Sequence, residues 1–205
     1  MAEHRQRQRR AILDAARAHL AEEGRAPSLA EVGARAGLAR SSVYEYFSSR
    51  QDLLAEVVAD VFPDWAGKVS AAIEAAATPG EQVWAYVEAN MRLFASSEQA
   101  VARALTNVVD PTLLAEPMTR FHQSLQEPLV AALRAHGEPQ PQLMADIIDS
   151  MVIRASRDLR EADHGTLQTD PDTALALLHN LLGPYLGRTT HTTRTLLSSR
   201  GANGE

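Results

Sequence analysis

The chain has 205 residues, 45% hydrophobic and 22% charged, a balance that supports a folded core rather than wholesale disorder. It contains no cysteine, which excludes disulfides, thiol nucleophiles and thiolate metal sites. We expect no membrane span, because apolar runs are short, and no signal peptide, because no apolar stretch follows the basic start. A soluble, cytoplasmic protein of one domain or two small ones is expected.

Charge is distributed unevenly along the chain. The net charge is −6, but residues 1–50 carry nine arginines against six acidic residues, so this segment is +3 and the remainder is −9. A basic head on an acidic body favours a local contact with nucleic acid. Four of the arginines lie within residues 5–10, where they form either a solvated tail or an arm that contacts DNA backbone or minor groove.

The spacing of apolar residues predicts an all-α protein of about nine or ten helices. The first helix is expected over residues 6–23, since its apolar residues recur at helical spacing and Gly24 follows it. No segment shows the alternation of a strand.

Residues 28–50 resemble two short helices joined by a tight turn. Ser28 can cap the first helix, and Glu31 stands three residues later, as a capping box requires. Gly37 is the residue most tolerant of positive φ, so it is expected to end that helix. The second helix, over residues 40–46, has an outward face of arginine, serine and tyrosine that suits a DNA groove. A purely structural helical hairpin has the same spacing.

A fourth helix is expected after Ser48 and Ser49, which can cap it. Arg50 lies in its first turn, where a cation opposes the helix dipole, and a bound phosphate would account for that cost. Pro63 is expected to close or kink this helix, and a separate helix is expected over residues 65–77.

Five further helices follow. They are predicted over residues 81–95, 98–109 and 116–136, and in two strongly apolar segments that start at Pro141 and Pro171.

Five short segments occur in fixed order within residues 8–58: ILDAAR (12–17), SL (28–29), AGL (36–38), SVYEYF (42–47) and RQDLL (50–54). In this order they resemble the amino-terminal domain of the tetracycline-repressor (TetR) family of bacterial transcriptional regulators. The resemblance implies a three-helix DNA-binding head, a helical ligand-binding body and a homodimer.

The resemblance also implies the DNA contacts, which are phosphate contacts for the first and last residue and groove or backbone contacts for the others. The matching positions are Ser28, Arg40, Ser41, Ser42, Tyr44, Tyr46 and Arg50. Three residues depart from the family pattern. Gly33 replaces the usual alanine and is expected to loosen its helix by about 0.5–1 kcal/mol. Ala39 replaces a capping serine, and Glu45 either reads cytosine or faces away from the groove.

The middle helices concentrate large aromatic and flexible side chains, which form either a core or the lining of a pocket. The predicted ligand-binding residues are Trp65, Trp84, Met91, Phe94, Asn107, Met118, Phe121, His122 and Arg154, with Asn90 as a further polar group. His122 equally suits a core histidine. Such a lining fits an apolar or aromatic effector with one or two polar groups better than a sugar or a nucleotide.

The last two helices carry broad apolar faces, which either close the intrachain core or form a four-helix dimer interface. The predicted interface residues are Ile147, Ile148, Met151, Leu178, Leu182 and Tyr185.

These observations predict a helix-turn-helix domain over residues 1–48, an effector-binding and dimerisation domain over 49–187, and a frayed tail over 188–205. The expected function is a ligand-responsive repressor, released from a pseudo-palindromic operator in double-stranded DNA by a small effector. Two alternatives stay open: an all-α small-molecule-binding or interaction protein whose head is structural, and a DNA-architectural protein without an effector. Since catalytic motifs and metal-ligand histidine spacings are absent from the sequence, we expect no enzyme activity, cofactor or metal.

Overall fold

The computed structural model describes residues 2–158 and 170–187, and every regular element in these ranges is an α-helix. The helices are α1 (Ala2–Glu23), α2 (Leu29–Ala36), α3 (Arg40–Tyr44), α4 (Arg50–Glu74), α5 (Pro79–Phe94), α6 (Ser97–Val108), α7 (Pro111–His136), α8 (Pro141–Asp158) and α9 (Pro171–Leu182). The predicted all-α class is confirmed. The frayed tail predicted for residues 188–205 lies outside the described residues.

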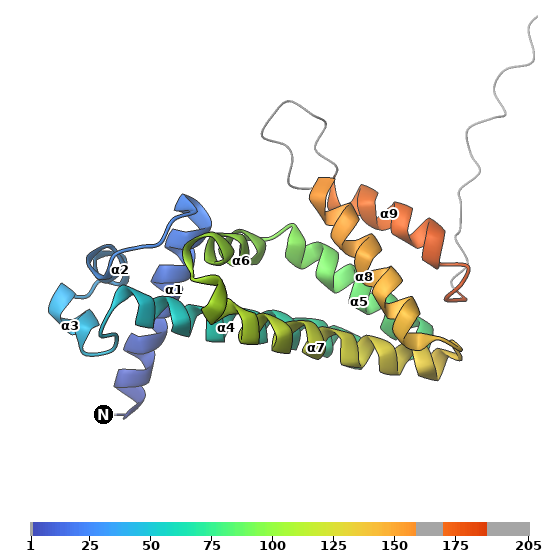
Figure 1. The fold of residues 1–205 in the computed structure, drawn as a ribbon, viewed down its shortest axis with the longest axis horizontal. Helices are drawn as coiled ribbons and strands as arrows, with labels where there is room; N and C mark the ends of the chain where they lie inside the picture. The colour runs from blue at the N-terminus through green and yellow to red at the C-terminus, as the bar shows by residue number, and fades with distance from the viewer. Residues whose placement is uncertain (1, 159–169, 188–205) are drawn as a thin grey trace, which may run out of the picture.

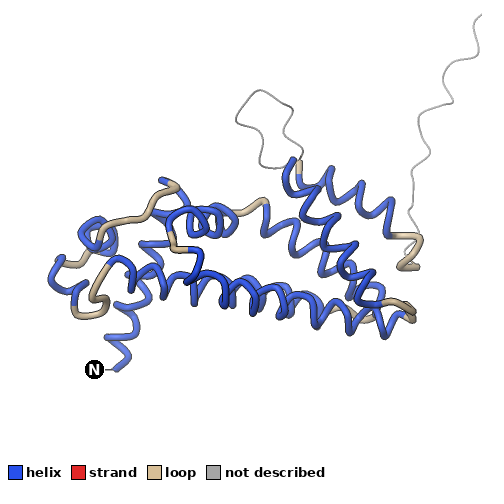
Figure 2. The backbone as a smooth tube through the Cα atoms, in the orientation of Figure 1, coloured by secondary structure: helices blue, strands red, loops and turns tan. Residues whose placement is uncertain are grey.

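The molecule is elongated, with α1, α2 and α3 at one end and α8 and α9 at the other (Figure 1). Helices α4 and α7 run along its length and pack against each other. Short loops join most of the helices, as Figure 2 shows. This arrangement makes α4 the direct connection between the head and the body.

Two clusters of buried apolar side chains hold the fold together. The first joins α1, α2 and α3 to the first half of α4 and to α6, with Leu53 and Leu105 both fully buried. The second joins the rest of α4 to α5, α7, α8 and α9. Phe121 on α7 packs against both clusters. The predicted boundary between residues 48 and 49 falls between α3 and α4 and stays a prediction.

The helix-turn-helix forms through the local signals that the sequence contains. The Ser28 hydroxyl accepts from the Glu31 N–H at 3.2 Å, and the Glu31 carboxylate accepts from the Ser28 N–H at 2.8 Å, which confirms the capping box. Gly37 ends α2 with φ of 69°, as expected. Ala39 starts α3 without a side-chain cap. Short-range hydrogen bonds therefore fix the turn between α2 and α3.

Gly33 has a packing role that its helix propensity does not reveal. A Cβ atom at this position would lie 3.0 Å from Cγ2 of Val43 and 3.1 Å from the carbonyl oxygen of Leu38. The glycine therefore permits the close approach of α2 and α3, and this contact offsets the loosening predicted for α2.

Several predicted helix boundaries were wrong. Helix α1 begins at Ala2 rather than at residue 6, so the arginines of residues 5–10 belong to a helix rather than to an extended arm. Helix α4 continues through Pro63 to Glu74 and includes the helix predicted over residues 65–77. Proline removes one backbone hydrogen bond, but α4 buries apolar side chains on both sides of Pro63, and tertiary packing decides the conformation.

Helix α7 also begins earlier than predicted. The Asp110 carboxylate accepts from the Thr112 N–H at 2.8 Å, and Pro111 occupies the first turn, where its missing N–H costs nothing. The helix then runs through Pro117 and Pro128 to His136, because its buried leucines face both apolar clusters.

Candidate nucleic-acid interface and effector cavity

The outer face of α3 presents the residues that the sequence predicts to read DNA. Arg40, Ser41 and Tyr44 are exposed, Ser42 is half-buried and Val43 points into the core. The Arg40 guanidinium donates to the Tyr44 hydroxyl at 3.1 Å and lies over the tyrosine ring, 5.5 Å from its centroid. This contact holds the arginine against the outer face of α3, and its predicted contact with phosphate or guanine stays a prediction.

The amino terminus of α4 adds a second basic position beside α3. Ser49 caps the helix by accepting from the Asp52 N–H at 3.1 Å, and the Asp52 carboxylate accepts from the Ser48 N–H at 2.9 Å. Arg50 is exposed and forms no ion pair within residues 2–158 and 170–187. Its guanidinium and the first N–H groups of α4 can therefore both interact with an anion, although the role of Arg50 in DNA binding stays a prediction.

Tyr46 and Ser28 are both predicted to contact DNA, and each side chain forms a hydrogen bond within the protein. The Tyr46 hydroxyl donates to Oε1 of Gln8 at 2.6 Å, and the Arg5 guanidinium lies 5.7 Å from the centroid of its ring. Helix α1 thus holds Tyr46 and brings Arg5 to the same surface. Ser28 is exposed at the start of α2, where its hydroxyl caps the helix.

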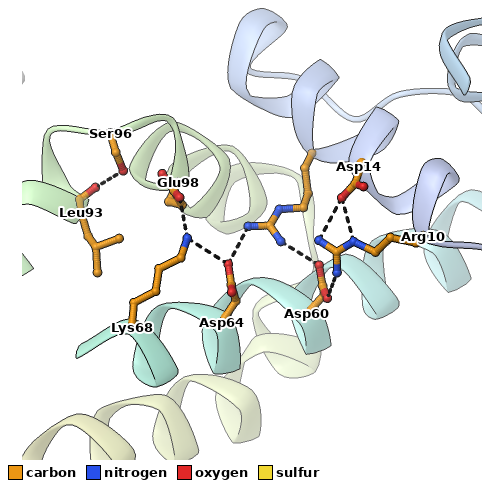
Figure 3. Close-up of polar contacts among 9 residues, drawn as sticks. Arg10, Asp14, Asp60, Asp64, Lys68, Leu93, Ser96 and Glu98 are labelled. Atoms are coloured by element: carbon orange, nitrogen blue, oxygen red, sulfur yellow. Dashed lines mark hydrogen bonds and ion pairs between the residues drawn. The ribbon is translucent and has the colours of Figure 1, made fainter. Parts of the chain in front are cut away.

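A chain of ion pairs joins α1 to α4 and then to α6 (Figure 3). Arg10 contacts Asp60 at 2.7 Å, and Asp60 also accepts from Arg17 at 2.8 Å. Arg17 reaches Asp64 at 3.1 Å, and Lys68 joins Asp64 at 3.2 Å to Glu98 at 2.7 Å. Arg9 also pairs with Glu56 of α4. The side chains of Arg9 and Arg10 are therefore paired with acids of α4 rather than solvated, and a contact of this segment with DNA stays a prediction.

The last carboxylate of this chain is held in its ionised form. Hydrogen bonds from Lys68 and then from Ser96 lower the pKa of Glu98 to about 2, against an opposing effect of partial burial. The ion pairs that hold α6 to α4 therefore persist well below neutral pH.

A cavity of 330 Å³ opens between α4, α5, α6, α7 and α8. Five of the predicted ligand-binding residues line it: Trp65, Phe94, Met118, Phe121 and His122. The Trp65 ring lies 5.1 Å from the ring of Phe94 and 6.0 Å from that of Phe121, and Phe121 lies 5.1 Å from Phe62. These rings form a connected aromatic wall.

Four predicted ligand-binding residues lie outside this cavity. Trp84 packs against His179 of α9 with ring centroids 4.9 Å apart, and Met91 is fully buried in the core. Asn107 is exposed on α6, and Arg154 lines a different groove, between α8 and α9. These residues were predicted to bind a ligand because of their side-chain type. The rotation of each helix about its axis directs them away from the cavity.

Asp149 is a cavity residue that is not among the predicted ligand-binding residues. It lines the cavity from α8, together with Ser156. The signal was present in the sequence, since Asp149 stands four residues after Ala145 and three before Val152, both fully buried. An acidic residue at helical spacing on an apolar stripe indicates a functional or hydrogen-bonded position.

A larger groove of 720 Å³ lies between α4 and α7 and shares Phe62 and Phe121 with the aromatic cavity. Its walls are mainly alanine, valine, proline and phenylalanine, and its charged residue is Arg120. Several polar groups converge in the smaller cavity, as is typical of small-molecule sites.

The outer surface of α8 and α9 is apolar. Leu143 and Ile147 on α8 are 53% and 44% exposed, and Leu177 and Leu181 on α9 are 60% and 67% exposed. A groove of 630 Å³ runs between the two helices, and Met151 is among its lining residues.

Several predicted interface residues lie elsewhere. Ile148, Leu178 and Leu182 are buried in the intrachain core, and Leu178 also reaches the floor of the α8–α9 groove. Tyr185 is half-buried, and its hydroxyl donates to Glu138 at 2.7 Å. The apolar surface available to a partner is therefore formed largely by the neighbours of the predicted residues.

An all-α fold with a capped helix-turn-helix at its basic end defines a class of DNA-binding regulators. Residues 12–57 match the family described as bacterial regulatory proteins, tetR family. The helix-turn-helix end of this chain therefore belongs to this family. No curated protein sequence matches the chain at a significant level.

Solved structures share the fold over most of the chain. The fatty acid degradation regulator FadR of Bacillus halodurans is 18% identical with a TM-score of 0.65, over 85% of this chain and 94% of that one. FadR of Bacillus subtilis, solved in complex with stearoyl-CoA, is 16% identical with a TM-score of 0.63, over 86% and 96%. A tetR-family regulatory protein of Rhodococcus RHA1 is 19% identical with a TM-score of 0.64, over 89% and 98%. At these identities the similarity concerns the fold.

Two further features bear on function. Within residues 2–158 and 170–187, no helix is both long enough and apolar enough to cross a membrane. In the same residues, no group of three or more histidine, aspartate or glutamate side chains could hold a metal ion.

Proposed function

We propose that this protein is a homodimeric repressor that a small apolar or aromatic effector releases from a pseudo-palindromic operator. The observation that carries the proposal is the continuity of α4, which has Arg50 at the candidate DNA face and Trp65 in the cavity wall. These residues are about 22 Å apart at 1.5 Å per residue. A ligand that displaces α4 at Trp65 therefore also displaces Arg50.

The ion pairs between α1, α4 and α6 support this coupling. They join Arg10 and Arg17 of the head to acids of α4, and Lys68 of α4 to Glu98 of α6. The head therefore moves with α4 rather than independently. The effector releases DNA only if it binds the DNA-free conformation more tightly than the DNA-bound one.

We assign DNA binding to residues 1–48 and effector binding with dimerisation to residues 49–187. The exposed apolar surface of α8 and α9 supports a four-helix dimer interface, since large apolar patches mark association sites. Two heads related by a twofold axis would contact two half-sites, which raises the specificity that one short helix provides.

An acyl-CoA is the alternative effector, because one structure of similar fold was solved with stearoyl-CoA. The aromatic cavity has a volume of 330 Å³, at the low end of the range of about 300–1,000 Å³ for small-molecule sites. This volume favours a small aromatic molecule over a long acyl chain.

The proposal is tested by electrophoretic mobility shift with DNA from upstream of the protein's own gene, against random DNA of equal length. We expect tight binding to the upstream fragment and release by at least one member of a panel of small aromatic compounds and acyl-CoAs. Equal binding to both DNAs would contradict the proposed role as a sequence-specific regulator. Tight, specific binding that no compound weakens would contradict the proposed response to an effector and would favour an architectural DNA-binding protein.

A further inference from the structure

The aromatic cavity contains a carboxylate that the fold holds in a fixed position. The hydroxyl of Tyr86 donates to Oδ1 of Asp149 at 2.8 Å. Tyr86 is 1% exposed, and its pKa is raised first by burial and then by the negative charge of Asp149. The tyrosine therefore stays protonated and acts as a permanent donor to the carboxylate.

The same helix, α5, also positions the aromatic wall. Asn90 lies one turn after Tyr86, donates through Nδ2 to the Tyr86 carbonyl at 2.9 Å and accepts from Nε1 of Trp65 at 3.1 Å. Asn90 is 2% exposed, so these hydrogen bonds form away from solvent. Tyr86 and Asn90 thus fix the positions of the Asp149 carboxylate and the Trp65 indole ring, which reduces the ordering that a ligand must impose.

The charge of Asp149 is available to a ligand. No lysine or arginine in the described parts of the chain forms an ion pair with it. A half-buried carboxylate beside an aromatic wall presents a negative charge and negative ring faces to the same space. Both features attract a cation.

We propose that the effector of this cavity is an organic cation: a protonated or quaternary amine on an aromatic or alicyclic body, with its charge near Asp149 and its apolar part against Trp65, Phe94 and Phe121. This inference rests on the proposed function, in which the cavity is the effector site. It specifies the polar group of the effector as positively charged.

Arg103 is the feature that argues for the opposite charge. It lines the same cavity from α6, where it would attract a carboxylate. Its side chain is exposed, however, whereas Asp149 is half-buried and hydrogen-bonded to a buried tyrosine. Since water screens an exposed charge much more than a half-buried one, Asp149 dominates the selectivity of the cavity.

The test uses three probes that share a naphthalene ring and differ in charge: naphthylethylamine, naphthylethanol and naphthylacetate. Calorimetric titration of the full chain without DNA measures their dissociation constants. We expect the amine to bind at least about tenfold more tightly than the alcohol, from a charge-assisted hydrogen bond and cation–π contacts, and the acetate to bind most weakly.

Asp149→Asn preserves the acceptor for Tyr86 and removes the charge, so it should bring amine binding to the level of alcohol binding. Arg103→Gln is the matched control and should preserve the preference for the amine. Tightest binding of the acetate, equal binding of amine and alcohol by the wild type, or no binding of any probe would overturn the inference. The comparison of probes on the wild type is decisive even if Asp149→Asn does not fold.

The outcome is separable from that of the proposed function. If the amine binds but does not release operator DNA, the result supports the cation site and contradicts the proposal that a ligand in this cavity controls DNA binding. If an acyl-CoA releases DNA and the amine does not bind, the result supports effector-controlled DNA binding and contradicts the cation site.

Discussion

Replacing Leu177 and Leu181 together with serine is expected to dissociate the dimer without unfolding the subunit. Complete burial of a leucine contributes about 1.5–3 kcal/mol. The two side chains are 60% and 67% exposed in the subunit, so each has about 1–2 kcal/mol to contribute on association. A twofold interface contains four such leucines, or about 4–8 kcal/mol in total. The dimer dissociation constant should therefore rise by about a thousandfold or more.

Sedimentation velocity over a range of protein concentrations measures this change directly. Leu113→Ser is the matched control, because Leu113 is 54% exposed on α7 and lies outside the α8–α9 groove. We expect the control to sediment as the wild type does and the double variant to sediment as a monomer with unchanged helicity. A double variant that dimerises as tightly as the wild type would refute the assignment of this surface.

Three further predictions concern DNA binding and stability. Arg50→Ala should weaken binding to all DNA and flatten the slope of log affinity against log salt by about 0.9 for each phosphate that the protein no longer neutralises. The control Arg134→Ala, on α7, should leave both the affinity and the slope unchanged. An unchanged slope for Arg50→Ala would exclude the phosphate role. Gly33→Ala should lower the free energy of unfolding by about 1–3 kcal/mol through overpacking. The control Gly67→Ala, where a Cβ meets open space, should raise it slightly. Equal melting temperatures of Gly33→Ala and the wild type would show that the α2–α3 contact tolerates a methyl group. Because the pKa of Glu98 is lowered from 4.5 to about 2, its contribution to stability is present above pH 4.5 and is lost as the pH falls towards 2, so Glu98→Gln should reduce the loss of stability in this range; identical pH profiles in chemical denaturation would contradict that.

The head could be predicted in detail from the sequence because its signals are local. The Ser28 and Glu31 capping box, the left-handed Gly37 and the inward Val43 each depend on residues within a few positions of one another. Gly33 was different, since its role depends on the distance between α2 and α3, which no local pattern contains.

The body could be predicted only as a set of apolar helices. Adjacent residues on a helix point about 100° apart, so the rotation of α8 about its axis decides whether Ile147 or Ile148 faces the core. In the structure Ile148 is fully buried and Ile147 is 44% exposed. The cavity depends on such rotations in five helices at once. The predicted ligand-binding set therefore includes Trp65 and Phe121, which line the cavity, as well as Asn107 and Arg154, which do not.

Selection of bound sequences from a random pool of DNA duplexes tests the central claim most directly, because it requires no knowledge of the operator or the effector. We expect the wild type to enrich a pseudo-palindrome with two half-sites. Arg40→Ala should enrich a different or degenerate half-site, since this arginine lies on the exposed face of α3. A wild-type pool without any enriched sequence, or an identical sequence selected by Arg40→Ala, would contradict DNA reading by α3.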